Sequence, residues 1–183
     1  MTAFVNKNNI QTIVALACIA ASGFAFGAPR QASAGARDCG LPVEFTPTDA
    51  DLPKTASSLK AGRKVKIVVI GGGSTAGAAA GGGEWAYPER FAVALRALFP
   101  KSEISIVNRG IARQSAQEMS NRFDRDVLGE KPLLVVWEAG IADSVRGVEV
   151  DDFRETIDAG VQKLHASGAE VVLMDTQYMR RAN

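Results

Sequence analysis

The chain has 183 residues, of which 46% are hydrophobic, and this is enough for one ordinary domain with additional segments at its ends. Its 21 lysines and arginines nearly balance its 20 aspartates and glutamates, and no basic stretch is interleaved with aromatic residues. This balance argues against nucleic acid or another polyanion as a partner.

The first 34 residues have the pattern of an export signal. Lys7 precedes an uncharged stretch whose apolar centre spans residues 13–21, and Ala32-Ser33-Ala34 fits the small-x-small pattern of a cleavage site. The apolar centre is short for a membrane span, which needs about 20 strongly apolar residues. We therefore expect an exported protein, periplasmic or secreted, that is cleaved near Ala34 and not stably inserted in a membrane. An uncleaved membrane anchor is the alternative.

Residues 35–62 are rich in proline, threonine, serine and aspartate, and they predict an extended arm with one short helix near residues 55–59. The arm contains Cys39, the one cysteine that remains after cleavage of the signal. No pattern of histidines or acidic residues around Cys39 marks it as a nucleophile or a metal ligand. We expect the folded domain to span residues 63–183.

Four short runs in this domain have the apolar composition of strands buried in a parallel sheet. Trp137, at the end of the third run, is expected in the hydrophobic core. Strand and helix patterns alternate along the chain, which predicts a doubly wound α/β fold with right-handed crossovers. The four predicted strands are residues 65–70, 103–107, 133–137 and 171–174.

Three helices are predicted between these strands. The first spans residues 87–99, with a proline in its first turn where the missing N–H is not needed. The second follows Ser115 and Glu118, which have the spacing of a capping box, and runs to residue 127. The third begins at residue 152 and ends at Gly168.

Glycine-containing loops are predicted after the first three strands, at residues 71–83, 108–112 and 140–145. The carboxyl ends of parallel strands lie at one edge of a sheet, so we expect these loops to meet where open α/β sheets bind their ligands. Ser74 is the first residue in the first loop with a reactive side chain.

The sequence resembles the GDSL/SGNH hydrolases at these three loops. The resemblance covers about residues 52–178 and implies a flavodoxin-like three-layer α/β/α sandwich with a parallel sheet. It also implies a serine hydrolase that acts on a small-molecule or saccharide ester, such as an acyl ester or an O-acetylated carbohydrate, without a cofactor or a metal. The matching segments are Gly72-Gly73-Ser74-Thr75-Ala76, Asn108-Arg109-Gly110, Gly140-x-x-Asp143 and Tyr87-Pro88-Glu89-Arg90.

The resemblance also implies roles for individual residues. Ser74 corresponds to the nucleophile, the N–H groups of Ser74 and Gly110 would face the oxyanion, and Gly140 and Asp143 belong to the third loop of the site. One departure is that Gly73 stands in the place of the family's aspartate.

A second departure concerns the oxyanion hole. Ala142 stands where the family has an asparagine whose side-chain amide completes the hole. Loss of one such donor typically lowers turnover by about 10²–10³. Efficient catalysis is therefore not expected from this site.

The base that a serine nucleophile needs is not evident in the sequence. The only histidine, His165, ends a crossover helix about 20 Å long and is expected on the surface at the opposite edge of the sheet. The family's base comes from an Asp-x-x-His block after a fifth strand, and these 183 residues do not contain that block. We therefore expect a truncated or degenerate hydrolase, without the last strand and helix of the fold, that is weak or inactive as it stands.

Four other charged residues near the functional edge have two interpretations each. Glu138, Asp143, Arg109 and Asp175 are candidates for orienting a substrate, and equally for loop caps or ion pairs.

Two alternatives to an esterase remain. One is a non-catalytic module of the same fold that binds a saccharide or a protein. The other is a dinucleotide-binding domain, because Gly71-x-Gly73-x-x-Ala76 follows a strand. Against a dinucleotide site, the loop continues to Gly83 before a helix begins, and the second strand ends in Asn108-Arg109 instead of an acid.

Overall fold

The computed structural model describes residues 51–174, and these residues form a four-stranded parallel sheet. The strand order is β2-β1-β3-β4, so the chain winds outward from the central β1 first to one side and then to the other. This confirms the doubly wound α/β fold. The expected export signal, Cys39 and Asp175 lie outside the described residues. The strands are β1 (Val65–Gly71), β2 (Ile104–Gly110), β3 (Leu134–Glu138) and β4 (Glu170–Met174).

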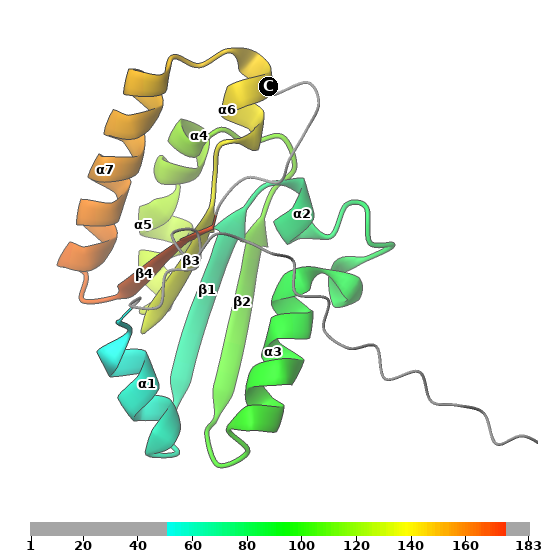
Figure 1. Ribbon diagram of the computed structural model, residues 1–183, viewed down its shortest axis with the longest axis vertical. Helices are drawn as coiled ribbons and strands as arrows, with labels where there is room; N and C mark the ends of the chain where they lie inside the picture. Colours follow the sequence, from blue (N-terminus) through cyan, green and yellow to red (C-terminus); the bar gives the residue numbers. More distant parts are fainter. Residues whose placement is uncertain (1–50, 175–183) are drawn as a thin grey trace, which may run out of the picture. The chain divides into compact units, whose positions relative to one another are not determined.

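Helices cover both faces of the sheet (Figure 1). Helices α1 and α3 lie on one face, helices α4, α5 and α7 lie on the other, and helices α2 and α6 lie at the carboxyl edge of the strands. Single turns of 3₁₀ helix span Gly83–Trp85 and Leu128–Glu130. The helices are α1 (Pro53–Lys60), α2 (Gly73–Ala76), α3 (Tyr87–Leu98), α4 (Ala116–Ser120), α5 (Phe123–Asp126), α6 (Ile141–Arg146) and α7 (Val150–Ala166).

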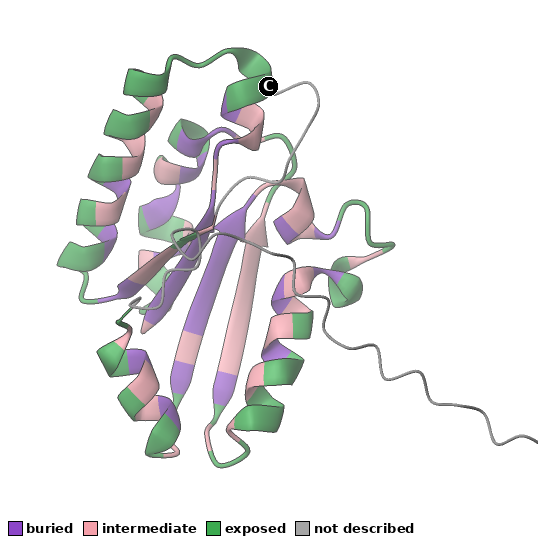
Figure 2. Cartoon of the chain, viewed as in Figure 1, coloured by how far each residue is buried: buried purple, intermediate pink, exposed green. Residues whose placement is uncertain are grey.

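Strand β1 is buried on both faces, as its continuous apolar run predicts (Figure 2). Val68 and Ile70 point into the core under α4, α5 and α7, whereas Ile67 and Val69 point into the core under α1 and α3. Alternate residues of a strand face opposite sides, so one sequence run contributes to both cores.

Helix α7 packs closely on β3 because Gly160 has no side chain. A Cβ atom at Gly160 would lie 2.5 Å from Cζ3 of Trp137. Trp137 is fully buried, as predicted, and its ring meets that of Phe123 edge-on at a centroid distance of 4.9 Å. The indole N–H donates to the sulfur of Met119 at 3.3 Å, so its polar atom is also satisfied.

The predicted second helix is two shorter helices, although its capping box at Ser115 and Glu118 is confirmed. Helix α4 ends at Ser120, and Arg122 then leaves helical geometry before α5 begins. The guanidinium of Arg122 is buried and donates to the carbonyl oxygen of Arg109 at 2.6 Å and to Gln114 at 2.8 Å. These hydrogen bonds join Arg122 to residues outside its own helices and hold it at the break between α4 and α5. Helix propensity along the sequence does not predict such contacts.

Three predicted loops have regular structure instead. Residues 108–110 continue β2 by pairing with the end of β1, residues 141–146 form α6, and residues 73–76 form α2. Helix α1 is the short helix predicted near residues 55–59 of the N-terminal arm, and its Lys54 and Thr55 N–H groups donate to the Glu170 carboxylate. Within residues 51–174, no helix is both long enough and apolar enough to cross a membrane.

Candidate active site

Ser74 lies in the first turn of α2, which begins directly after β1 ends. This tight passage from strand to helix depends on Gly71. A Cβ atom at Gly71 would collide with Oγ1 of Thr75 and would lie 2.8 Å from Oε2 of Glu138. The glycine therefore leaves room for two polar side chains directly behind Ser74.

Glu138 ends β3, and its carboxylate holds the hydroxyl groups of the neighbouring α2. Ser74 Oγ donates to Glu138 Oε1, and Thr75 Oγ1 donates to Glu138 Oε2. Glu138 is only 3% exposed and Thr75 is fully buried, while Ser74 is half-buried. Each of the two carboxylate oxygens thus accepts one hydroxyl proton, and one of those hydroxyls is the predicted nucleophile.

Tyr87, at the start of α3, continues this chain of hydroxyl groups. Its hydroxyl oxygen lies 3.3 Å from Thr75 Oγ1. Because the single proton of Thr75 is donated to Glu138, Tyr87 is the donor in this contact. Burial is the main cause that raises the pKa of Tyr87, and the negative charge of Glu138 also raises it, so the net shift is upward. The phenol therefore keeps its proton at neutral pH.

Ser74 opens onto a cavity of about 450 Å³ at the carboxyl edge of the sheet. The walls come from the segments that follow β1, β2 and β3, which are the three places where the sequence predicted that the site would assemble. The residues that line it are Gly72, Gly73, Ser74, Ala112, Arg113, Gln114, Met119, Glu138, Ala139, Gly140, Ile141, Ala142, Val145 and Arg146.

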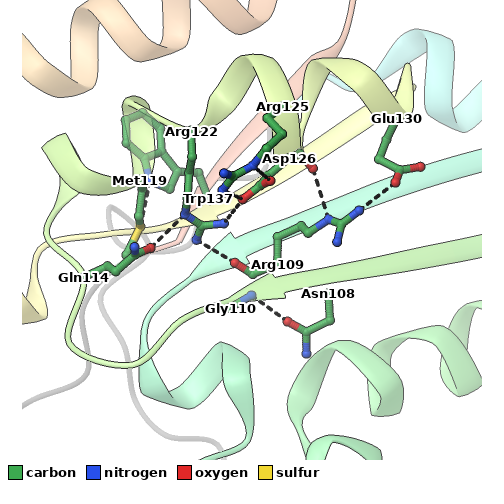
Figure 3. Close-up of polar contacts among 10 residues, drawn as sticks. All are labelled: Asn108, Arg109, Gly110, Gln114, Met119, Arg122, Arg125, Asp126, Glu130 and Trp137. Carbon is green, nitrogen blue, oxygen red and sulfur yellow. Dashed lines mark hydrogen bonds and ion pairs between the residues drawn. The ribbon is translucent and has the colours of Figure 1, made fainter.

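Gly110 does not have the predicted geometry of an oxyanion donor. Its N–H donates to Oδ1 of Asn108 at 2.9 Å (Figure 3), and Gly110 is not among the residues that line the cavity. A Cβ atom at Gly110 would lie 2.7 Å from the carbonyl carbon of Thr75. The glycine instead allows β2 to approach α2, where Asn108 Nδ2 donates to the Thr75 carbonyl oxygen at 2.7 Å.

Asp143 and Gly140 have different places in the third segment. Asp143 is buried, and both of its carboxylate oxygens lie 3.0 Å from the N–H of Ala116, so it ties α6 to the first turn of α4. It does not line the cavity, whereas Gly140 does. Gly140 has φ of 109°, a conformation that other residues rarely adopt, and it turns the chain from β3 into α6.

Arg109 belongs to an ion-pair network (Figure 3), and it is not among the residues that line the cavity. Its guanidinium pairs with Glu130 at 2.8 Å and donates to the carbonyl oxygen of Asp126 at 3.2 Å. The ion-pair interpretation of Arg109 therefore holds. Hydrogen bonds from Arg125 and Arg122 hold the pKa of Asp126 at about 2, below its ordinary value of 3.8, although burial acts in the opposite direction.

His165 is exposed, as predicted, and lies at the amino edge of the sheet near Leu52, Lys54 and Glu170. This is the edge opposite to Ser74, because Glu170 begins β4 whereas Ser74 follows the end of β1. His165 therefore has no access to the Ser74 hydroxyl.

Sequence reasoning missed two arginines that line the cavity. Arg113 has φ of 68°, an uncommon left-handed conformation for a residue with a side chain. Arg146 stabilises this turn, because it donates to the carbonyl oxygen of Arg113 at 2.6 Å and pairs with Glu118 at 3.0 Å. No local motif in the sequence predicts that either arginine lines the cavity, because the contact between them depends on how α6 packs beside α4.

The chain is similar to known proteins both in sequence and in fold. The sequence profile of the non-GDSL lipase-like family matches residues 38–183. The chain belongs to this family. A comparison with curated protein sequences found no match. The family assignment confirms the resemblance to GDSL/SGNH hydrolases. Separately, within residues 51–174 no group of three histidine, cysteine or acidic side chains is arranged to hold a metal ion.

Solved structures similar to this member of the non-GDSL lipase-like family include several esterases. A protein from Desulfitobacterium hafniense DCB-2, assigned to the lipolytic G-D-S-L family, shares 31% identity with a TM-score of 0.57, over 64% of this chain and 63% of that one. A two-domain esterase active on acetylated mannans shares 27% identity with a TM-score of 0.61, over 67% and 33% of the two chains.

An acetyl xylan esterase variant from Geobacillus stearothermophilus shares 26% identity with a TM-score of 0.51, over 60% of this chain and 58% of that one. The chain thus spans less than two thirds of the length of each of these three proteins.

Proposed function

We propose that this protein hydrolyses esters and that Ser74 is its nucleophile. The observation that carries the proposal is the position of the Ser74 hydroxyl, which lies at the wall of the carboxyl-edge cavity and donates to the buried carboxylate of Glu138. A hydroxyl is nucleophilic when a neighbouring group can accept its proton. The family and the esterases among the similar structures support the same chemistry.

The proposed substrates are small acyl esters, including O-acetyl groups on carbohydrates. A cavity of about 450 Å³ is large enough for an acetyl group and part of the alcohol that carries it. Two of the similar proteins act on acetylated mannans and acetyl xylan, respectively. An exported location, which we propose from the pattern of the first 34 residues, would bring the protein into contact with such polymers.

The backbone N–H of Ser74 is the proposed donor to the oxyanion. It lies in the first turn of α2, where N–H groups have no partner within the helix. The N–H of Gly110 is already bonded to Asn108, and Ala142 has no side-chain amide. The site therefore has fewer donors to an oxyanion than the sequence resemblance implies. We therefore expect slow turnover, because oxyanion donors are usually the largest single contribution to such reactions.

The test is hydrolysis of 4-nitrophenyl acetate by the wild-type protein and by Ser74→Ala. We expect the variant to lose turnover above the background rate, whereas Ser102→Ala should keep it. Ser102 is the matched control, because its hydroxyl donates to the Leu59 carbonyl oxygen at the amino edge of the sheet. Equal rates in wild type and Ser74→Ala would reject the proposal and leave the non-catalytic binding module.

A further inference from the structure

Two arginines, Arg113 and Arg146, line the cavity onto which Ser74 opens. Arg113 lies in the turn between β2 and α4, and Arg146 ends α6. Several other lining side chains are apolar, Met119 and Val145 among them. Cavities of this kind bind small molecules in apolar surroundings, and a few polar groups set the orientation of the ligand. Here two of those polar groups carry a positive charge.

The backbone at Arg113 is held in an uncommon conformation at the wall of the cavity. Its φ is 68°, and its carbonyl oxygen accepts a hydrogen bond of 2.6 Å from Nη2 of Arg146. Nη1 of Arg146 donates to Glu118 at 3.0 Å, and Glu118 also accepts from the Ser115 N–H at 2.8 Å, which ties the turn to the start of α4. Residues held in sparsely populated conformations by their surroundings are frequent at ligand-binding positions.

The polar lining of the cavity offers a ligand mainly hydrogen-bond donors. The guanidinium groups of the two arginines have donors and no acceptor. The side-chain oxygen of Gln114, which also lines the cavity, already accepts from Nε of Arg122 at 2.8 Å (Figure 3). Both carboxylate oxygens of Glu138 already accept protons from hydroxyl groups. A ligand with negatively charged acceptor atoms fits this lining best.

The two arginines have different tasks. Both Nη atoms of Arg146 are bonded to protein groups, and its charge is balanced by Glu118. The Ser115 N–H and the Arg146 guanidinium lower the pKa of Glu118, so this partner is ionised at neutral pH. Arg113 has an exposed side chain and lines the cavity. Arg113 is therefore the cation that a ligand meets, and Arg146 is a positioning residue that holds the turn.

We propose that Arg113 binds an anionic group on the substrate, so that the preferred esters carry a carboxylate near the ester bond. This inference rests on the proposed function of Ser74. A guanidinium matches a carboxylate with two parallel hydrogen bonds, which an ammonium group does not. Because Ser74 and Arg113 line one cavity of about 450 Å³, a single small ester contacts both. The carboxylate belongs either to the acyl group or to the alcohol, and the test distinguishes these two sources.

The test compares wild type with Arg113→Gln on two pairs of esters. 4-Acetoxybenzoate and 4-acetoxybenzamide differ in charge on the alcohol side, and mono-4-nitrophenyl adipate and 4-nitrophenyl hexanoate differ in charge on the acyl side. We expect the ratio of kcat/KM for the charged to the neutral ester to fall by about tenfold in Arg113→Gln for one pair, mainly through KM. Taking a ratio removes any effect of the substitution that both esters share.

Binding gives a second measurement that does not depend on turnover. The Kd values of 4-acetoxybenzoate and 4-acetoxybenzamide, and of the two acyl-side esters, should be measured for Ser74→Ala with and without Arg113→Gln. The preference for the charged ligand should weaken when the salt concentration rises from about 0.05 M to about 0.5 M, and it should do so only where Arg113 is present. A merely structural role of Arg113 would not give this salt dependence.

Two further variants serve as controls. Arg113→Lys keeps the charge without the planar fork, so it should recover part of the preference that Arg113→Gln loses. Arg63→Gln removes an exposed cation that lies just before β1, at the opposite edge of the sheet, and it should leave the preference as in wild type. An equal loss in Arg63→Gln would assign the preference to net charge and overturn the inference.

The outcomes separate this inference from the proposed function. If Ser74→Ala abolishes hydrolysis but both pairs give the same ratios in wild type and Arg113→Gln, the esterase stands and Arg113 is no anion site, which favours a neutral saccharide ester. If Ser74→Ala hydrolyses as wild type does, the proposed function fails. A charge preference in the Kd values that is lost with Arg113→Gln would still show that Arg113 binds the anion.

Discussion

In the proposed role as nucleophile, Ser74 would depend on neighbours that hold its proton and on donors to the negative charge that forms after attack. The Ser74 and Thr75 hydroxyl groups both donate to the buried carboxylate of Glu138, which fixes the direction of the Ser74 hydroxyl. The site has few hydrogen-bond donors for an oxyanion. Ala142 lines the cavity with a methyl group, and the N–H of Gly110 is already bonded to Asn108. Both features lower the turnover that we expect from the proposed site.

Replacing Ala142 with asparagine should raise turnover of 4-nitrophenyl acetate by up to about 10²-fold, with a smaller effect on KM. An amide at this position would meet negative charge that is present mainly in the transition state. Rates of wild type, Ala142→Asn and Ser144→Asn should be compared under the same conditions. Ser144 lies two residues further along α6 and does not line the cavity, so that variant should be no faster than wild type. An Ala142→Asn protein that folds without any gain would count against an oxyanion at this wall.

At the scale of elements, the placement of α7 against β3 depends on one small residue. Gly160 lies against the rings of Trp137 and Phe123, which are both fully buried and packed against each other. Strand β3 ends in Glu138, so a shift of Trp137 would be passed directly to the carboxylate that holds Ser74. The helix is thus coupled to the site through the strand, although none of its residues lines the cavity.

Gly160→Ala should destabilise the protein by about 1–3 kcal/mol, as overpacked cores do. Alanine improves helix propensity by about 1 kcal/mol, but the new Cβ would lie within 2.6 Å of two ring carbons of Trp137. The ring is wedged against Phe123, so we expect the clash to exceed the gain. Urea unfolding measures the difference. Gly129→Ala is the control, because its Cβ would meet only the Asp124 carbonyl oxygen at 3.6 Å; a loss of stability there as large as in Gly160→Ala would argue against the clash.

At the scale of the whole molecule, several carboxyl groups have lowered pKa values, and each of them makes the fold more stable at neutral pH than in acid. The pKa values of Glu118, Asp126, Glu130 and Glu170 are all lowered in the folded chain, mainly by hydrogen bonds from cations and backbone N–H groups. In Glu170, burial is the largest single influence and raises the pKa, but the bonds from Thr55 and Lys54 together outweigh it. Groups of this kind stabilise the fold above their unfolded pKa and lose that contribution in acid.

Asp126 gives the clearest case. Its pKa falls from 3.8 to about 2, so it stabilises the fold above about pH 4 by at most about 2 kcal/mol, and this contribution is lost as the pH falls to 2. Asp126→Asn should therefore be less stable than wild type at pH 5, with the difference shrinking toward pH 2. Urea unfolding at both pH values checks this. Asp124→Asn breaks only an exposed pair with Lys163 and should change little; a pH-independent effect of Asp126→Asn would contradict the linkage.

The sequence alone was sufficient for features that depend on neighbours along the chain. The apolar run of β1, the capping box of Ser115 and Glu118 and the position of Ser74 after the first strand were all predicted correctly, and so was the doubly wound α/β fold. Each follows from periodicity or from contacts a few residues apart, which the order of the amino acids contains directly.

The tertiary structure decided which side chains meet at the site. Glu138 contacts Ser74 across 64 positions of the chain, the Gly110 N–H is taken by Asn108, and Asp143 caps α4 instead of facing the cavity. The sequence offered both Glu138 and Asp143 as candidate acids in one segment, and the resemblance placed Asp143 alone in the site. Strand pairing places Glu138, at the end of β3, beside β1. The turn at Gly140 instead directs Asp143 toward α4. Both positions are set by packing between segments that are far apart in the sequence.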